Sequence, residues 1–285
     1  MTLPTPDPAF RWATEACGPA LRCSRLDAVA QHLFTSKQLK LQPQMTGPHG
    51  PQLTQITTPG WTAAAAALGA AADRVIRVKQ VHGNVVRVLK RGRVAADAHL
   101  ERPDGDAVVA NEPGLVLAVA VADCVPILLA DAASGSAAAV HAGWRGTCAR
   151  VVSAAVECMV RECGAKAEDL TAAIGPSIGP ADYEVGDSVV DAFRQSGHTQ
   201  ADIDRWFSRG VGKPRLDLWS ANRDQLKEAG VRADRIFTCG LSTLAHPGVF
   251  DSFRREGEGA GRMAALIVVP EKKGAPGAGR PNVVA

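Results

Sequence analysis

Four short apolar segments in close succession most limit the folds open to this chain of 285 residues. They are DAVVA from Asp106, LVLAVAVAD to Asp123, PILLAD to Asp131 and SAAAVHAG to Gly143. Glycine, proline or aspartate separates each segment from the next. Short apolar runs with such boundaries are typical of strands that are buried on both faces. We therefore expect the centre of the chain to form successive strands inside a core.

Segments with mixed helical and strand spacing flank this centre. WTAAAAALGAAAD predicts a helix ending at Asp73, and RVIRVKQVHGNVVRVLK predicts paired or bent strands with His82 at the bend. A second helix is expected after GWRGT, with Thr147 as its N-cap and a glycine at its end. Further helices are expected at DSVVDAFRQSG and WSANRDQLKEAG, and further strands at LTAAIG, RLDL, RIFTC and MAALIVV. The pattern predicts an α+β (mixed α/β) protein.

Both ends of the chain lack an apolar period. We expect residues 1–20 to be a loose segment and residues 271–285 to be a flexible tail. No convincing linker divides the part between them. Residues 20–270 are therefore expected to form a single domain.

The charge balance and the cysteines narrow the class of protein. The 32 basic and 29 acidic residues nearly cancel, which argues against nucleic acid as a partner and favours a small-molecule substrate. No apolar run approaches the roughly 20 residues of a membrane span, and the start has no signal-like core, so we expect a cytoplasmic protein. The seven cysteines are an odd number with no dense pattern, as expected of reduced thiols.

Three residues near the predicted strand ends could carry chemistry: His82, Cys124 and His141. Imidazole and thiolate are ligands that zinc prefers, and a catalytic zinc site usually has three protein ligands and an open fourth position. The same residues could instead form a Cys124 nucleophile with a histidine base and no metal. The spacing in the sequence does not separate these two interpretations.

Polar residues in the same segments could support such a site. Asp123 follows an apolar run. It could orient a metal-binding histidine through a hydrogen bond to the ring, or simply end a turn. Gly143 and Gly146 would let the backbone come close to a ligand. Arg145, between them, has a planar guanidinium group whose donors can form paired hydrogen bonds with phosphate or carboxylate.

Several motifs occur together and in order along the chain. They are QVHG at 80–83, ADCVP at 122–126, VHAGWRGT at 140–147, IGPSIGPADYEVG at 174–186, DLWSANRDQL at 217–226 and SFRREGEGAGRMAALI at 252–267. In this arrangement the chain resembles the laccase-domain family, also called the multicopper polyphenol oxidase or peptidoglycan editing factor family. The resemblance spans about residues 30–270. It implies an α-β-β-α sandwich and a purine nucleoside phosphorylase with adenosine deaminase activity.

The resemblance also implies a set of site residues. Its zinc-binding histidines and cysteine fall on His82, Cys124 and His141, which would thus be both metal ligands and catalytic residues. The implied reactions are phosphate-dependent cleavage of adenosine, inosine, guanosine or methylthioadenosine to base and ribose 1-phosphate, and loss of ammonia from adenosine. Zinc could lower the pKa of a water molecule for deamination, whereas cleavage needs a positioned phosphate.

Contacts to substrate and phosphate are expected from residues of the later motifs. The candidates are Arg145, Arg254, Ser177 and Tyr183, with Arg255, Arg262, Lys79 and Glu184 as further possibilities. His32 matches a recurrent histidine of the family and could approach the pocket or pack in the core. The segment HLFTSKQLKLQPQMTGPHG replaces a glycine-rich loop of many relatives, which leaves the shape of the substrate open.

Three other functions stay open at this point. Copper-dependent polyphenol oxidation fits poorly, because copper oxidase centres need several histidines, whereas the sequence offers seven in all and only three placed convincingly. A cysteine hydrolase or amidase acting on peptidoglycan precursors would use Cys124 as nucleophile. A cell-wall or division factor would need a structural zinc, which normally has four protein ligands. The protein could be a monomer or a homodimer.

Overall fold

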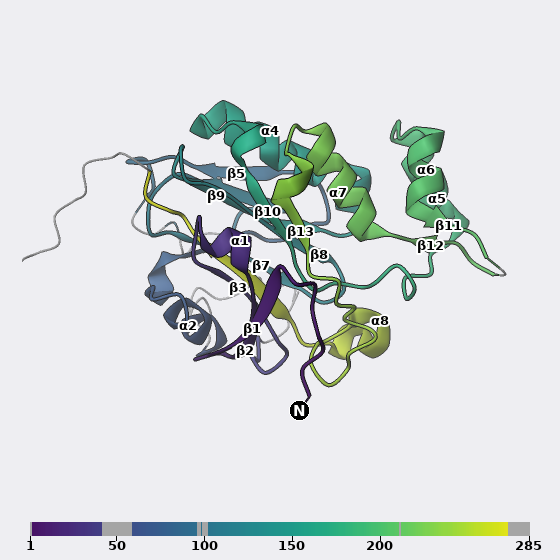
Figure 1. Cartoon of the computed structure of the whole chain (residues 1–285), viewed down its shortest axis with the longest axis horizontal. Helices are drawn as coiled ribbons and strands as arrows, with labels where there is room; N and C mark the ends of the chain where they lie inside the picture. Colours follow the sequence, from purple (N-terminus) through teal and green to yellow (C-terminus); the bar gives the residue numbers. More distant parts are fainter. Residues whose placement is uncertain (1, 42–58, 96–97, 99–101, 211, 273–285) are drawn as a thin grey trace, which may run out of the picture.

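The computed structural model describes residues 2–41, 59–95, 98, 102–210 and 212–272. Two six-stranded sheets dominate these residues (Figure 1). In sheet order, the first sheet contains β1 (Phe10–Glu15), β2 (Gly18–Cys23), β3 (His32–Thr35), β14 (Met263–Val268), β7 (Val116–Val121) and β4 (Val75–Arg77). The second contains β13 (Ile236–Thr238), β10 (Thr171–Ile174), β8 (Val125–Asp131), β9 (Ser136–Ala142), β6 (Ala107–Ala110) and β5 (Val86–Leu89).

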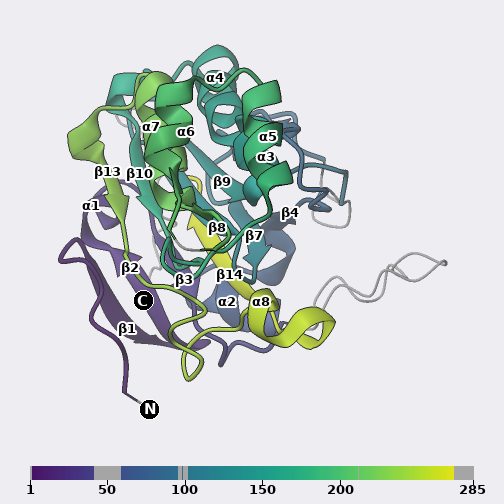
Figure 2. The same cartoon turned by 90° about the vertical axis from the view of Figure 1, so that its right-hand side faces the viewer.

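Helices cover the outer faces of both sheets (Figure 2). The α-helices of the described residues are α1 (Ser24–Asp27), α2 (Pro59–Ala66), α3 (Trp144–Cys148), α4 (Val151–Cys163), α5 (Asp187–Gln195), α6 (Gln200–Trp206), α7 (Leu218–Glu228) and α8 (Phe253–Glu256). A short hairpin of β11 (Phe207–Ser208) and β12 (Arg215–Leu216) follows α6. None of the described helices has both the length and the apolar character needed to cross a bilayer.

The core has three layers, as expected when both faces of each central strand are apolar. Leu117 and Leu128 pack between the sheets, in the cluster that also holds Val108. Their neighbours point the other way: Ile127 packs under the helices of the second sheet, and Val116 packs against the side covered by α2. Alternate side chains of one strand therefore fill two different layers. The predicted α-β-β-α sandwich and the four central strands are confirmed.

Among the described strands the chain changes between the two six-stranded sheets four times, and two of these crossings carry residues singled out above. β4 pairs with β7 in the first sheet, whereas β5 pairs with β6 in the second, so residues 78–85 cross between the sheets. The two strands around His82 are therefore not paired with each other. Residues 122–124 make the other of these two crossings, from β7 to β8.

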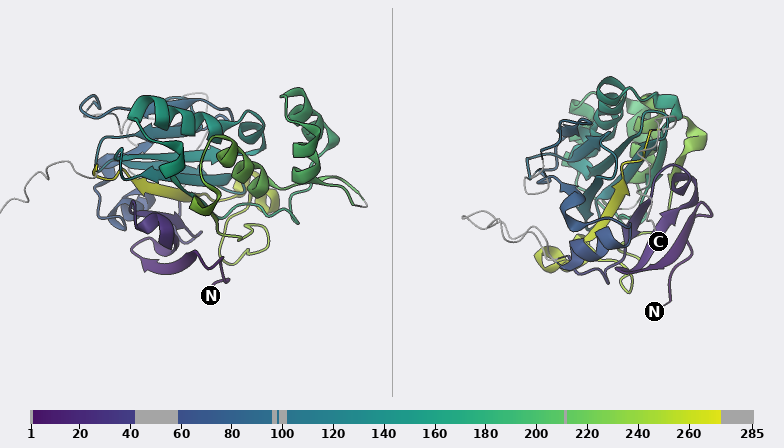
Figure 3. Two further views of the ribbon diagram at one scale, coloured as in Figure 1. Left: turned by 45° about the horizontal axis from the view of Figure 1, so that its top comes forward. Right: turned by 90° about the vertical axis from the view of Figure 1, so that its left-hand side faces the viewer.

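Some expected boundaries were wrong. Residues 1–20 were expected to be loose, but β1 and the start of β2 form an antiparallel hairpin there, closed by the Arg22 to Glu15 ion pair at 2.8 Å. The helix expected to reach Asp73 ends at Ala66, where the chain turns through Gly69 in a left-handed conformation. Most of the expected tail, residues 273–285, lies outside the described residues. Figure 3 shows the β1–β2 hairpin, in purple, together with the helices that cover the second sheet.

Candidate active site

Three neighbouring strand ends of the second sheet bring polar residues together. Pro126 of β8 is opposite His141 of β9, which places Cys124 beside the end of β9. On the other side of β9, the His141 backbone N–H donates to the Asp106 carbonyl at 2.8 Å, where β6 begins. Sheet register therefore sets the positions of Asp106, His141 and Cys124 before any side chain is considered.

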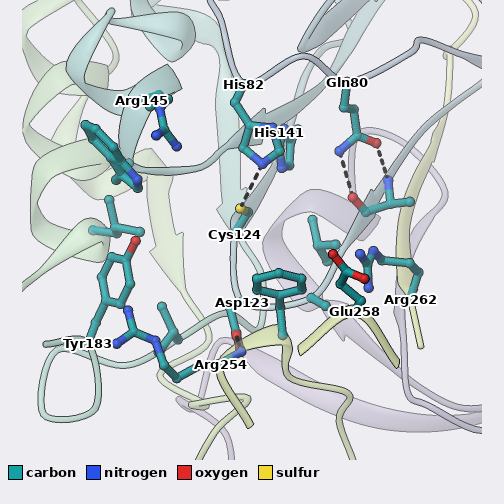
Figure 4. A pocket seen from close by; sticks show the side chains of 17 residues that line it. Gln80, His82, Asp123, Cys124, His141, Arg145, Tyr183, Arg254, Glu258 and Arg262 are labelled. Carbon is teal, nitrogen blue, oxygen red and sulfur yellow. Dashed lines mark hydrogen bonds between the residues drawn. The ribbon is translucent and has the colours of Figure 1, made fainter. Parts of the chain in front are cut away.

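His82 reaches the same place from the first crossing. Its φ of 61° is in the left-handed region, which is uncommon for residues other than glycine. The Asp106 carboxylate accepts hydrogen bonds from the backbone N–H groups of His82 at 2.9 Å and Gly83 at 2.6 Å. These bonds hold the loop in the turn that directs the His82 ring toward Cys124 (Figure 4).

The three predicted ligands form one compact donor set. The ligand atoms of His82, Cys124 and His141 all lie within 4.8 Å of one another. The sulfur of Cys124 is 3.9 Å from Nε2 of His82, and the two imidazole rings are nearly perpendicular, with centroids 4.8 Å apart. The Nδ1 atom of His141 is 2.8 Å from Asp106, which leaves Nε2 to face the cluster.

These residues fit a zinc ion by their chemistry and by the space kept for them. Two imidazoles and one thiolate form the ligand set of some catalytic zinc sites, with a fourth position open. A Cβ on Gly143 would lie 2.9 Å from the Cys124 sulfur and 3.1 Å from Cδ2 of His82. The glycine therefore leaves room for both donors to converge.

Electrostatics favour the deprotonated thiol. Burial would raise the pKa of Cys124, but the charge and hydrogen bonds of the two histidines, above all His141, lower it to about 6. Burial would likewise lower the pKa of His141, but the Cys124 thiolate and Asp106 raise it to about 9. A thiolate is the form of cysteine that binds metal or attacks carbon.

Of the two roles considered for Asp123, orienting a histidine and ending a turn, the structure does not show the first. Its carboxylate accepts hydrogen bonds from the Thr243 hydroxyl at 2.6 Å, the Ser252 hydroxyl at 3.0 Å and the Arg254 backbone N–H at 2.6 Å. Asp123 therefore ties the crossing at residues 122–124 to the start of α8. Asp106 holds the histidines instead.

Sequence reasoning missed Asp106, although a signal was present. The residue is an aspartate directly before a strand whose other positions are all apolar, and it is fully buried in the structure. A buried carboxylate needs hydrogen-bond donors or an opposite charge. Applied to DAVVA, that rule would have pointed to a partner near the strand end, without naming which one.

A pocket of about 970 Å³ lies over the donor set (Figure 4). Its wall contains Arg145 and Arg254, which form no ion pair with a carboxylate of the described residues. Within the described chain, the guanidinium groups of Arg145 and Arg254 form no hydrogen bond or ion pair; they lie over the rings of Trp144 at 4.3 Å and Tyr183 at 5.1 Å from the centroids. Trp144, Phe253 and Glu258 also line the pocket.

The remaining predicted contacts divide into lining and structural residues. Tyr183 and Arg262 also line the pocket, and burial raises the pKa of the Tyr183 phenol to about 12, so it stays neutral. Ser177 does not line it: the side chain is fully buried and accepts a hydrogen bond from Trp219 at 2.6 Å. Arg255 donates to the carbonyls of residues 243, 244 and 250, which gives it a structural role.

Three other residues also have structural partners. Glu184 pairs with Arg215 at 3.0 Å, and Lys79 pairs with Asp104 at 3.3 Å. Thr147 is not an N-cap, because it lies within α3 and accepts a hydrogen bond from Asn222 at 3.1 Å. The N-cap of α4 is Arg150, with a left-handed backbone.

The fold and this pocket define a class: two-sheet sandwich proteins with a candidate His, Cys, His metal site at the point where the chain crosses between sheets. The chain belongs to the family described as multi-copper polyphenol oxidoreductase laccase, whose model matches residues 58–270. The resemblance stated from the motifs is thereby confirmed.

Relatives and solved structures agree with this assignment. The chain is 42% identical over 219 residues to a purine nucleoside phosphorylase of Deinococcus radiodurans, covering 76% of this chain and 78% of the relative. It is 39% identical over 198 residues to adenosine deaminase RL5 of an unknown prokaryotic organism, covering 68% and 75%. The crystal structure of Bacillus licheniformis YfiH superposes with a TM-score of 0.77 at 27% identity, covering 92% of this chain and all of that one. The chain is an enzyme of this family.

Proposed function

We propose that the protein is a zinc-dependent purine nucleoside phosphorylase that also deaminates adenosine. The relatives named above support the two reactions, one of them carrying each name. The proposed substrates are adenosine, inosine, guanosine and methylthioadenosine, with phosphate as the second reactant. A pocket of about 970 Å³ is within the size range of small-molecule sites.

His82, Cys124 and His141 would hold the metal, each through one donor atom. When bound, zinc supplies Lewis-acid activation and can lower the pKa of a water molecule toward neutrality. Copper is the less favoured metal, because copper oxidase centres use more histidines than this cluster offers. The chain's task at this point is to fix the three donors and to keep the pocket side open.

In phosphorolysis, the side of the pocket that holds Arg145 and Arg254 would bind phosphate. The bond between the base nitrogen and C1′ of the ribose breaks, a phosphate oxygen bonds to C1′, and the electron pair leaves with the base, which takes up a proton. Arg145 and Arg254 are placed to bind phosphate, because neither is neutralised by a carboxylate of the described chain. The rings of Trp144 and Tyr183 offer flat surfaces for the base and ribose.

In deamination, water replaces phosphate as the reactant. Water adds to the ring carbon that carries the amino group, and ammonia leaves. The phosphate-binding arginines are not required for this step. The two reactions therefore share the donor set but differ in their need for Arg145.

The observation that carries the proposal is the combination of an open three-donor cluster with unneutralised arginines in one pocket. The test is the release of adenine, hypoxanthine and ammonia from adenosine, with and without phosphate and a chelator. We expect base release to require phosphate and to stop with the chelator. Base release that does not depend on phosphate, or no reaction with any purine nucleoside, would refute the proposal.

One observation favours a second candidate, a cysteine hydrolase or amidase acting on peptidoglycan precursors. The lowered pKa of Cys124 beside His141 is what a cysteine nucleophile needs as well. This candidate predicts a covalent intermediate on Cys124 and an activity that survives chelation. Chelation of the wild-type protein therefore separates the two functions.

A further inference from the structure

Asp106 contacts both histidines of the donor set, and it does so in two different ways. Its Oδ1 lies 2.8 Å from Nδ1 of the His141 ring. The same oxygen accepts the backbone N–H of His82 at 2.9 Å, while Oδ2 accepts that of Gly83 at 2.6 Å. One carboxylate is thus bonded to a ligand's ring and to another ligand's backbone.

Burial makes this arrangement rigid. Asp106 is fully buried, and its own backbone is fixed on both sides: its N–H donates to Val85 at 2.9 Å, and its carbonyl accepts from His141 at 2.8 Å. His141 is 3% exposed. Neither side chain can turn away without leaving buried polar atoms unpaired, which is costly.

The contact to the 81–83 loop opposes a conformational preference. His82 has a φ of 61°, which a residue with a side chain adopts only when its surroundings require it. The N–H groups of residues 81, 82 and 83 all point at the Asp106 carboxylate, the first at 3.3 Å. The carboxylate therefore supplies the reason for the turn that brings the His82 ring to Cys124.

We propose that Asp106 is the positioning residue of the metal site, fixing the ring orientation of His141 and the backbone turn of His82 with a single carboxylate. This inference rests on the metal site of the proposed function. With Nδ1–H of His141 donated to Asp106, Nε2 is the atom left for the metal. Removing the carboxylate releases two of the three donors at once.

The experiment compares zinc affinity in wild-type protein, Asp106→Asn and Asp131→Asn by competition with a chromophoric chelator. Asparagine keeps the size of the side chain but has only one oxygen that can accept hydrogen bonds. Asp131 is a matched control: it is buried and accepts two backbone N–H bonds of 2.9 Å, but lies at the far end of β8 from Cys124. We expect Asp106→Asn to bind zinc about 10 to 100 times more weakly, and Asp131→Asn to bind it as the wild type does.

A folded Asp106→Asn variant with wild-type zinc affinity would overturn the inference. If that variant does not fold, histidine ¹⁵N NMR of the wild-type protein decides the matter. We expect Nδ1 of His141 to carry a proton in both the zinc-bound and the metal-free protein; an Nδ1 without a proton would contradict the assignment. Wild-type protein that binds no zinc would instead refute the proposed function, and the NMR measurement on metal-free protein would still test the Asp106 contact.

Discussion

Two regions of the molecule bury a histidine on a strand, and in only one of them is a ring nitrogen left available to bind a metal. At His32 of β3, Nε2 accepts the Cys23 backbone N–H at 2.9 Å, and Nδ1 is 3.1 Å from the Ala30 carbonyl. At His141 of β9, Nδ1 is bonded to Asp106 and Nε2 faces Cys124 and His82. His32 is therefore the packed alternative of the two considered from the sequence.

The difference teaches that a ligand histidine is recognised by what its second nitrogen does. Both rings are almost fully buried, yet their pKa values move in opposite directions. Burial lowers the pKa of His32 to about 4, whereas the negative charges of Cys124 and Asp106 outweigh burial and raise that of His141 to about 9. At His32 burial outweighs the Asp27 carboxylate 3.4 Å from Nδ1, whereas at His141 the nearby negative charges outweigh burial, as a cation site requires.

The largest effect should come from removing a donor from the second region. Cys124→Ala or His141→Ala should lose bound zinc and lower turnover on the order of 10³-fold, because each removes one of three ligands. His32→Gln should keep its zinc and most of its turnover. Metal analysis, nucleoside assays and circular dichroism check this; retained nucleoside cleavage in either donor variant would break the comparison.

A smaller effect concerns the pH dependence of stability in the first region. The folded pKa of His32, about 4, is below the unfolded value of about 6.5, so the unfolded chain binds a proton that the native chain does not. The contribution is present above pH 6.5 and is lost as the pH falls through 4, to a total of about 3 kcal/mol.

Urea unfolding of wild type and His32→Gln at several pH values measures this contribution. His32→Gln should be less stable at pH 7, and its free energy of unfolding should fall less between pH 6.5 and 4. Parallel pH profiles for the two proteins would show that His32 is not held neutral.

The smallest effect sharpens the contrast between the donor set and the arginine side of its pocket. Arg145→Ala should raise the KM for phosphate about 10-fold or more, because a charge-assisted hydrogen bond is worth about 1.5–3 kcal/mol. Deamination of adenosine should change much less. Arg232→Ala is the control, since Arg232 is paired with Asp234 at 2.8 Å on the surface. An equal loss in both reactions would mean that Arg145 does not serve phosphate.

Much of the second sheet could be predicted from the sequence, because its strands are buried on both faces and read as apolar runs. The β1 and β2 hairpin was missed, since prolines around FRWATE mask its alternation. The donor set was named from the motifs, but its geometry depends on two crossings between sheets, which no spacing reveals. Asp106 was missed because its bonds to His82 and His141 join residues 24 and 35 positions away.

The central claim is that His82, Cys124 and His141 form a zinc site on which nucleoside cleavage depends. The most direct test is to strip the metal from wild-type protein and measure phosphate-dependent base release while zinc is added back. We expect negligible release from the metal-free protein and a rise that levels off at about one zinc per chain, as one three-ligand site requires. Full release from the metal-free protein would contradict it and favour Cys124 acting alone.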